Sequence, residues 1–117
     1  MRTLLRSKLQ EVIVTDANPE YEGSITIGTE LMEAAGLVEY EQVEVNGKET
    51  PARIKTYVIA GKEGQVMLNG GAAQHFKKGD KVHVLAFSTK RPFPDEELRI
   101  VYTDENNAVT EIVKKYI

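Results

Sequence analysis

The sequence contains no cysteine and only two histidines, so several kinds of chemistry are closed to it. Without cysteine the chain has no disulfide framework, no thiol nucleophile and no thiolate ligand for a metal. His75 and His83 stand in different sequence contexts and make a poor ligand set on their own. We therefore expect no metal centre.

The sequence also lacks a long apolar run and an excess of positive charge. Apolar residues make up 41% of the chain, but no segment approaches the roughly 20 consecutive apolar residues of a membrane-spanning helix. The pair Leu4-Leu5 is far shorter than the apolar part of a signal peptide. The formal net charge is −3, whereas a nucleic-acid partner requires clustered Lys and Arg. These features predict a cytoplasmic protein that binds neither nucleic acid nor a membrane.

What the chain does contain is a series of short apolar stretches between turn residues, with no internal repeat or linker. We expect a single domain over residues 1–117 with one core, since single domains commonly span about 100–150 residues. Alternation and β-branched content predict strands at residues 9–14, 24–27, 42–45, 53–60, 65–68, 81–87, 100–102 and 108–113. So many short strands favour a barrel.

Turns and two short helices connect these strands. A loop and two turns are predicted at residues 16–20, Asn46-Gly47 and Gly79-Asp80. One helix is indicated by Thr29 as the N-cap, by the helical spacing of Leu31, Ala34 and Ala35, and by Gly36 as the stop. A second helix is predicted over residues 71–76.

Two stretches are difficult to explain by packing alone, residues 21–27 and residues 68–73. A Gly-Ser pair such as Gly23-Ser24 is usually a turn, and the Gly-x-Ser-x-Gly elbow of esterases is absent because Glu22 replaces its first glycine. The second stretch, Asn69-Gly70-Gly71-Ala72-Ala73, contains neither a dinucleotide fingerprint nor a Gly-Lys-Ser/Thr motif. It is either a turn that enters a helix or a set of backbone N–H groups open to an anion.

Taken together, these stretches and their spacing resemble the pyruvoyl-dependent aspartate 1-decarboxylase family over about residues 1–113. The resemblance rests on Lys8, Val14-Thr15-Asp16-Ala17, Tyr21-Glu22-Gly23-Ser24, Ala34-Ala35-Gly36, Arg53, Thr56-Tyr57, Asn69-Gly70-Gly71-Ala72-Ala73 and Gly79-Asp80. The chain departs from the family pattern at Thr50-Pro51-Ala52, where an Asn-Gly turn is usual, and at Gly71, where alanine is commoner. Neither departure removes a side chain to which the resemblance assigns chemistry.

The resemblance implies a mainly β fold, a small six-stranded double-psi β-barrel with short helices, assembled as a homotetramer with active sites between subunits. It also implies that the precursor cuts itself between Gly23 and Ser24 into residues 1–23, the β chain, and 24–117, the α chain. The Ser24 hydroxyl would attack the carbonyl carbon of Gly23, with Thr56 stabilising the oxyanion, and the resulting ester would give a pyruvoyl group. Glycine suits this step because it adopts strained backbone geometries. The sequence leaves open whether maturation uses an accessory protein.

The implied reaction is the decarboxylation of L-aspartate to β-alanine and carbon dioxide, a carboxy-lyase step that supplies pantothenate and coenzyme A biosynthesis. The covalent pyruvoyl ketone from Ser24 forms an imine with the substrate amine, so neither a metal nor pyridoxal phosphate is required. The matching family positions assign proton donation to Tyr57 and substrate binding to Lys8, Arg53, Thr56, Asn69, Gly70, Gly71 and Ala72. Without the resemblance, the same residues fit ordinary strand packing and surface charge. His75 and His83 receive no role.

Two other interpretations of the sequence remain. The chain could be an unprocessed or inactive barrel homologue that serves only for binding or assembly. It could also be a conventional serine hydrolase, which needs a histidine and an acid that the sequence does not place beside Ser24. Intact mass separates these classes, because only the decarboxylase yields residues 1–23 and 24–117 as separate chains.

Overall fold

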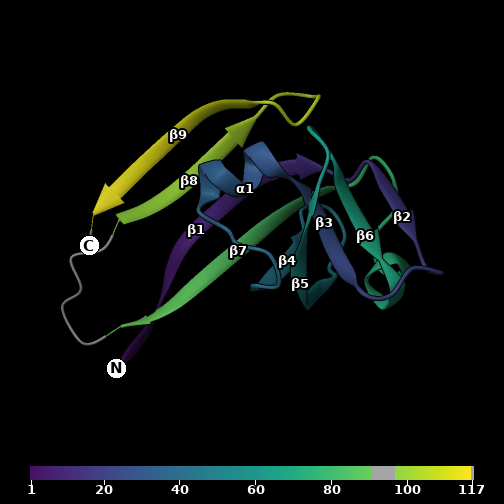
Figure 1. The fold of residues 1–117 in the computed structure, drawn as a ribbon, viewed down its shortest axis with the longest axis horizontal. Coiled ribbons are helices and arrows are strands. Elements are labelled where there is room, and N and C mark those ends of the chain that lie inside the picture. Colours follow the sequence, from purple (N-terminus) through teal and green to yellow (C-terminus); the bar gives the residue numbers. More distant parts are fainter. Residues whose placement is uncertain (91–96, 117) are drawn as a thin grey trace.

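The computed structural model describes residues 1–90 and 97–116, and most of the regular structure in these ranges is strand. In chain order, the elements are β1 (Arg2–Ile13), β2 (Asp16–Asn18), β3 (Ser24–Gly28), α1 (Thr29–Ala35), β4 (Gln42–Gly47), β5 (Arg53–Gly61), β6 (Val66–Asn69), η1 (Gly70–Gln74, a 3-10 helix), β7 (Lys81–Lys90), β8 (Glu97–Thr103) and β9 (Val109–Tyr116). The predicted mainly β fold with short helices is confirmed. Figure 1 shows β2, β3 and β6 at one end of the molecule, and both chain ends at the other.

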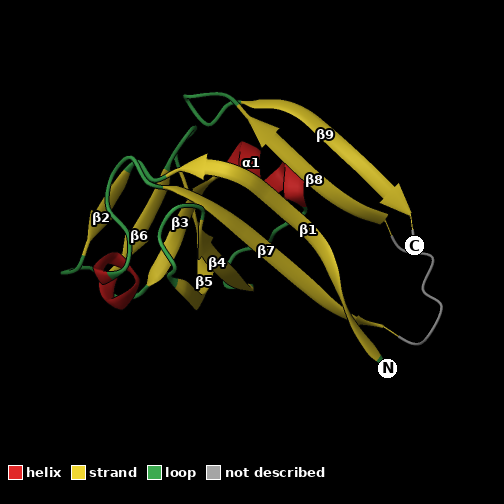
Figure 2. Ribbon diagram, turned by 180° about the vertical axis from the view of Figure 1, so that it is seen from behind, coloured by secondary structure: helices red, strands yellow, loops and turns green. Residues whose placement is uncertain are grey.

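The strands form one mixed sheet in the order β2-β6-β3-β5-β4-β7-β1-β8-β9. The pairs β2–β6, β3–β5 and β1–β8 are parallel, and the other neighbouring pairs are antiparallel. β1 and β7 form a long pair that runs through most of the length of the molecule (Figure 2). β3 therefore lies between β6 and β5, which together position the predicted cleavage site.

The central six strands follow one another from β6 to β1 in the sheet. The first of them, β6, is hydrogen-bonded to the residue that follows the last, β1. Thr15, which follows β1, donates its backbone N–H to the carbonyl oxygen of Val66 in β6 at 2.7 Å. Val66 N–H donates in turn to Oγ1 of Thr15 at 3.0 Å. This contact agrees with the six-stranded barrel that the resemblance implies, with β2, β8 and β9 outside it.

Alternation along the central strands builds one hydrophobic core. In β7, for example, Val82 and Val84 are buried, whereas the intervening His83 is only half-buried. Other fully buried side chains come from strands, from α1 (Leu31) and from the segment after β1 (Val14): Leu9, Val12, Ile25, Ile27, Val43, Val45, Val58, Val66 and Leu68. α1 contacts β1, β3, β8 and β9 and so covers part of this core. Arg53, Tyr57 and His83 lie at outward-facing positions of the strands, whereas Ser24 and Asn69 are buried.

The helix α1 is confirmed, with one correction at its beginning. The N-cap is Gly28 and not Thr29, because Gly28 has extended backbone angles and Thr29 is already the first helical residue. At the other end, Gly36 adopts the left-handed conformation with a φ of +72°, as its prediction as a stop requires. Neither helix in the described ranges is long and apolar enough to cross a membrane.

Other differences from the sequence prediction arise from tertiary pairing. Residues 16–18, predicted as loop, form β2 because they pair in parallel with β6. Asn46 and Gly47 belong to β4, and the turn comes afterwards, where Gly47 N–H donates to the Ala52 carbonyl oxygen at 2.9 Å. The predicted second helix is present as the 3-10 helix η1, which begins at Gly70.

The side chain of Asn107 links the turn between β8 and β9 to the rest of the molecule by hydrogen bonds. Its side chain is 1% exposed, and its φ of +60° lies in the left-handed region that asparagine tolerates. Oδ1 accepts a hydrogen bond from Ile13 N–H at 2.8 Å, and Nδ2 donates to the carbonyl oxygens of Ile13 at 2.8 Å and Gly64 at 3.0 Å. One amide therefore joins three segments that are distant in sequence.

Replacing Asn107 by alanine should lower the free energy of unfolding by about 2–4 kcal/mol, because buried backbone groups lose their partners. Urea denaturation monitored by circular dichroism measures the change. Asn106→Ala is the matched control, since Asn106 is exposed and its backbone N–H makes the hydrogen bond to Asp104, so it should shift stability by less than about 0.5 kcal/mol. Equal destabilisation by both variants would contradict the role of the Asn107 side chain.

Candidate active site

The predicted cleavage site lies where β3 begins. Gly23 is exposed, and nothing lies within 4 Å of the position that a Cβ would occupy there. Ser24, in contrast, is 3% exposed and has a backbone φ of +151°, in the positive range that residues other than glycine rarely adopt. Such a conformation persists only where surrounding contacts impose it. The Gly23–Ser24 peptide bond therefore joins an accessible residue to a constrained one.

Asn69, the last residue of β6, holds Ser24 in place. The two residues are partners in the antiparallel β3–β6 ladder. Nδ2 of Asn69 donates to Oγ of Ser24 at 2.8 Å and to Oγ1 of Thr26 at 3.0 Å. Asn69 is 2% exposed, and its Oδ1 has no hydrogen-bond partner among the described residues. Because an amide does not act as a general base, this neighbour of Ser24 does not fit a conventional serine hydrolase.

Gly70 lies directly against the residues that precede the cleavage site. Its φ is +59°, and a Cβ there would approach Cα and N of Gly23 and the carbonyl oxygen of Tyr21 to 2.8 Å each. Such contacts are shorter than van der Waals packing permits, so glycine is required both for conformation and for space. Gly71 is exposed with open space around it, whereas Ala72 packs against the core.

Thr56 and Tyr57 lie on β5, the other neighbour of β3. The parallel ladder pairs Ile25 with Val58, and the same register continued by one residue puts Tyr57 level with Ser24. Tyr57 is 39% exposed, and alternation puts it on the outward face of β5. Thr56 points to the opposite side of the strand and is half-buried. Tyr57 is therefore the predicted catalytic side chain that faces outward beside the cleavage site.

Lys8 and Arg53, the predicted carboxylate anchors, lie on a second part of the outward face. Arg53 pairs with Asn46 of β4, and Asn46 pairs with His83 of β7. Lys8 of β1 pairs with Leu85, two residues after His83 and on the same side of β7. Directly opposed residues in a sheet point to the same face. Lys8, Asn46, Arg53 and His83 therefore share one face, which we call the anchor face.

His83 carries the titratable imidazole of the anchor face. Burial lowers the pKa of His83 from its ordinary value, and the positive charge of Lys8 lowers it further. Glu11 raises this pKa, but Lys48 and Arg53 also lower it. The imidazole is therefore neutral near pH 7.

Glu11 contacts both His83 and Lys48. It occupies an irregularity of β1 between Leu9 and Val12, with a φ of +54°, and there its backbone N–H donates to Nδ1 of His83 at 3.3 Å. Its carboxylate forms an ion pair with Lys48 at 2.8 Å. The hydrogen bond with Lys48 lowers the pKa of Glu11, which is therefore ionised at neutral pH.

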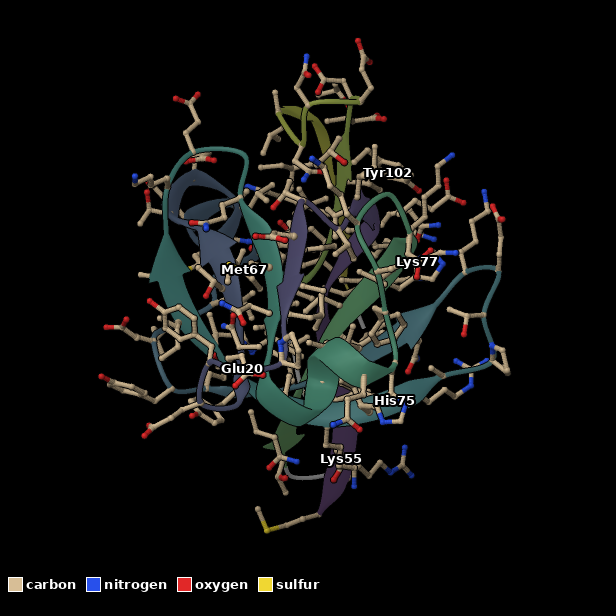
Figure 3. The ribbon with its side chains drawn as sticks, turned by 90° about the vertical axis from the view of Figure 1, so that its right-hand side faces the viewer. Glu20, Lys55, Met67, His75, Lys77 and Tyr102 are labelled. Carbon is tan, nitrogen blue, oxygen red and sulfur yellow. The ribbon has the colours of Figure 1, made fainter. Side chains whose placement is uncertain are left out.

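The other histidine, His75, belongs to neither group. It is exposed at the end of η1, where its backbone N–H donates to the Ala72 carbonyl oxygen at 3.1 Å (Figure 3). Within residues 1–90 and 97–116, no three His, Asp or Glu side chains gather in a way that could hold a metal ion. The two histidines of the chain thus occupy contrasting environments, one half-buried among charges and one exposed.

The structure brings the predicted site residues together in two groups. Ser24 and Gly23 meet Asn69 and Gly70 at the start of β3, and Lys8 and Arg53 share the anchor face. β5 runs between the groups, because Arg53 is its first residue and Val58 is paired with β3. From Arg53 to Tyr57 the strand rises about 13 Å, at roughly 3.3 Å per residue. In one chain, the anchors and the cleavage site therefore lie at different levels of β5.

Two residues of the anchor face, Asn46 and His83, have no place in the site predicted from the sequence. Asn46 was assigned to a turn because it precedes Gly47, and His83 was assigned to an outward strand position without a role. The alternation of Val82, His83 and Val84 does predict that the histidine points outward. What the sequence does not reveal is that β4 places this outward position in line with Arg53.

The sequence is similar to known proteins over most of its length. The chain matches the aspartate decarboxylase family over residues 1–110. It is 41% identical to an aspartate 1-decarboxylase of Clostridium kluyveri over 116 residues, which cover 93% of this chain and 89% of the relative. It is 46% identical to an aspartate 1-decarboxylase of Salinibacter ruber over 112 residues, covering 92% of this chain and 77% of the relative. For an aspartate 1-decarboxylase of Dehalococcoides mccartyi the identity is 43% over 113 residues, covering 93% and 91%. With a match over nearly its whole length, the chain belongs to the aspartate decarboxylase family.

Proposed function

We propose that this chain is a pyruvoyl-dependent aspartate 1-decarboxylase, which cleaves itself between Gly23 and Ser24 and then converts L-aspartate into β-alanine and carbon dioxide. The observation that carries the proposal is the state of Ser24, whose buried hydroxyl is held by Asn69 while its backbone has a rarely adopted φ. Family membership supports the same reaction. The reaction is a carboxy-lyase step, and we assign it to the cytoplasm and to the supply of β-alanine for pantothenate.

The self-cleavage is an acyl shift followed by elimination. Oγ of Ser24 forms a bond to the carbonyl carbon of Gly23, the peptide C–N bond breaks, and the proton of the hydroxyl passes to the released amine. Loss of the Ser24 α-proton then breaks the Cβ–O bond and frees Gly23 as a carboxylate. Addition of water to the new N-terminus releases ammonia and leaves a ketone. Thr56 is assigned to the oxyanion of the first step by its match to the family position, and within one chain its side chain lies on the opposite face of β5 from Tyr57.

The surroundings of Ser24 fit the pyruvoyl group that this sequence of steps would produce. Nδ2 of Asn69 donates to Oγ of Ser24, an oxygen that leaves with Gly23 when the Cβ–O bond breaks, and this N–H is then free to donate to the new carbonyl oxygen on Cα. The group would supply an electrophilic carbonyl that holds the substrate amine and accepts the electron pair left by carbon dioxide. Oδ1 of Asn69, which has no partner among the described residues, is available to accept a hydrogen bond from the substrate.

The remaining residues bind the substrate and move a proton. Aspartate carries two carboxylates, so Lys8 and Arg53 are assigned to them as cationic anchors. Backbone N–H groups at Gly70, Gly71 and Ala72 are assigned to further hydrogen bonds with a carboxylate, with Thr56 and Asn69 as polar contacts. Tyr57 is assigned to donate a proton to the carbon that loses carbon dioxide, because its phenol faces outward level with Ser24.

The working assembly is a homotetramer with active sites between subunits. The geometry of β5 supports this arrangement, because about 13 Å of strand separates Arg53 from the level of Ser24. A neighbouring subunit whose anchor face meets this cleavage site supplies the missing charges without a change of fold. Maturation in the cell can involve an accessory protein that promotes cleavage of the precursor.

Gly70→Ala should slow self-cleavage at least about tenfold, because the new Cβ displaces Gly23 and Tyr21 and a positive φ is costly for alanine. A displacement that raises the barrier by about 1.4 kcal/mol is sufficient for this effect. The conversion of the full-length chain into two chains, followed by denaturing gel and mass spectrometry, gives the rate.

Gly71→Ala is the matched control for cleavage, since a Cβ at Gly71 meets nothing within 4 Å. It should cleave at the wild-type rate. Circular dichroism of both variants shows whether the fold is retained. Normal cleavage of a folded Gly70→Ala variant would contradict the account of the Gly70–Gly23 contact.

Tyr57→Phe tests the decarboxylation step separately from maturation. The variant keeps the aromatic ring and loses only the hydroxyl, so it should cleave normally into two chains. Production of β-alanine from L-aspartate by this matured sample should fall at least about 100-fold, because a positioned acid contributes about 100–10,000-fold. Wild-type activity in a fully cleaved sample would remove Tyr57 from the mechanism. A matured wild-type protein without β-alanine production would contradict the proposed function itself.

A further inference from the structure

The anchor face contains an imidazole whose orientation is determined by the backbone. Glu11 N–H points at Nδ1 of His83 at 3.3 Å, so Nδ1 must be the unprotonated, accepting nitrogen of the ring. The neutral imidazole then carries its proton on Nε2. A hydrogen-bond donor is thus presented on the same face as the two cationic side chains Lys8 and Arg53.

A second observation also marks the anchor face as a ligand site. Asn46, which lies between Arg53 and His83 in the strand pairing, is 8% exposed, and its Oδ1 has no hydrogen-bond partner among the described residues. A buried polar atom without a partner is costly, and native proteins usually supply one from water or a ligand. Oδ1 of Asn46, between Arg53 and His83, is therefore open to a hydrogen bond from water or a ligand.

We propose that His83 is a substrate-positioning residue, whose Nε2–H donates to a carboxylate of a dicarboxylate substrate held by Lys8 and Arg53. This inference rests on the proposed function for the identity of the substrate as aspartate. Two cations and a neutral N–H donor on one face suit an anion with several oxygen acceptors, although Glu44, which pairs with Leu85, lies on the same face. Asn46 supports the site by retaining water or ligand beside the imidazole.

The pKa of His83 reports whether an anion binds beside the imidazole. The groups that act on the imidazole are Lys8, Glu11, Lys48 and Arg53, and apart from Glu11 all of them oppose its protonation. A bound dianion favours the protonated form, so binding should raise the pKa of His83, although protonation of Nδ1 gives up the hydrogen bond from Glu11 N–H. By linkage, affinity for the dianion should increase as the pH falls from the pKa of the complex to that of the free protein. His75, exposed on η1, is not among the groups that act on the imidazole of His83, so its signal serves as the reference.

Succinate binding to the full-length Ser24→Ala protein tests the inference without any decarboxylation. The imidazole signals of both histidines are followed by NMR over pH with and without succinate. Succinate should raise the pKa of His83 by at least about half a unit, while the His75 signal provides an internal reference that does not change. An unchanged His83 pKa, or no succinate binding, would overturn the proposal.

Variants in the same background separate positioning from a merely structural role. His83→Leu should weaken succinate binding at pH 7.5 at least about tenfold, as expected for a lost hydrogen bond to a charged group. His83→Gln keeps an N–H donor, so it should bind within about threefold of the parent but lose the increase in affinity at low pH. His75→Leu is the matched control and should bind normally. Parental affinity in a folded His83→Leu variant would overturn the inference.

Failure of the proposed function and failure of the role of His83 give different experimental results. If succinate binds at His83 but the matured wild-type protein releases no carbon dioxide from L-aspartate, the dicarboxylate site stands and the proposed function fails. If decarboxylation proceeds and the KM for L-aspartate in matured His83→Leu equals that of the wild type, the proposed function stands and the role of His83 fails.

Discussion

The hydrogen bonds from the Asn69 amide to the hydroxyls of Ser24 and Thr26 hold the end of β6 against the start of β3. The rest of the site depends on this contact, because it keeps a serine with a rarely adopted φ buried beside an accessible glycine. Gly70, the next residue after Asn69, can then lie against Gly23 only because it has no side chain. The Asn69-Gly70 segment thus both restrains Ser24 and leaves space for Gly23.

β5 connects this segment to the anchor face. Its parallel pairing with β3 brings Tyr57 level with Ser24, and its antiparallel pairing with β4 aligns Arg53 with Asn46 and His83. About 13 Å of strand separates Arg53 from the level of Ser24, which supports the proposed placement of the active site between neighbouring subunits. On the anchor face, the positive charges of Lys8 and Arg53 lie on the same side of the sheet as His83, whose pKa is lowered chiefly by burial.

Alternation in the sequence predicted the strands that contain Ser24, Arg53 and His83, and the glycine at position 36 predicted the end of α1, because these signals are local. Residues 16–18 became a strand, and Asn46 lies in a strand instead of a turn, because pairing with β6 and β7 outweighs the loop preference of Asp and Asn. The resemblance supplied the roles of Ser24 and Tyr57. The alignment of His83 with Arg53 and the orphaned Oδ1 of Asn46 follow from sheet register, which periodicity alone does not determine.

The central claim is that the Gly23–Ser24 bond is broken by the chain itself, and intact mass spectrometry of purified wild-type protein tests it most directly. The account predicts two chains, residues 1–23 and residues 24–117, with the second blocked at its N-terminus by a pyruvoyl group in place of an amine. Ser24→Ala, which deletes only the attacking oxygen, should remain a single folded chain. A wild-type protein that stays full-length after prolonged incubation, or a Ser24→Ala variant that still yields two chains, would contradict the account.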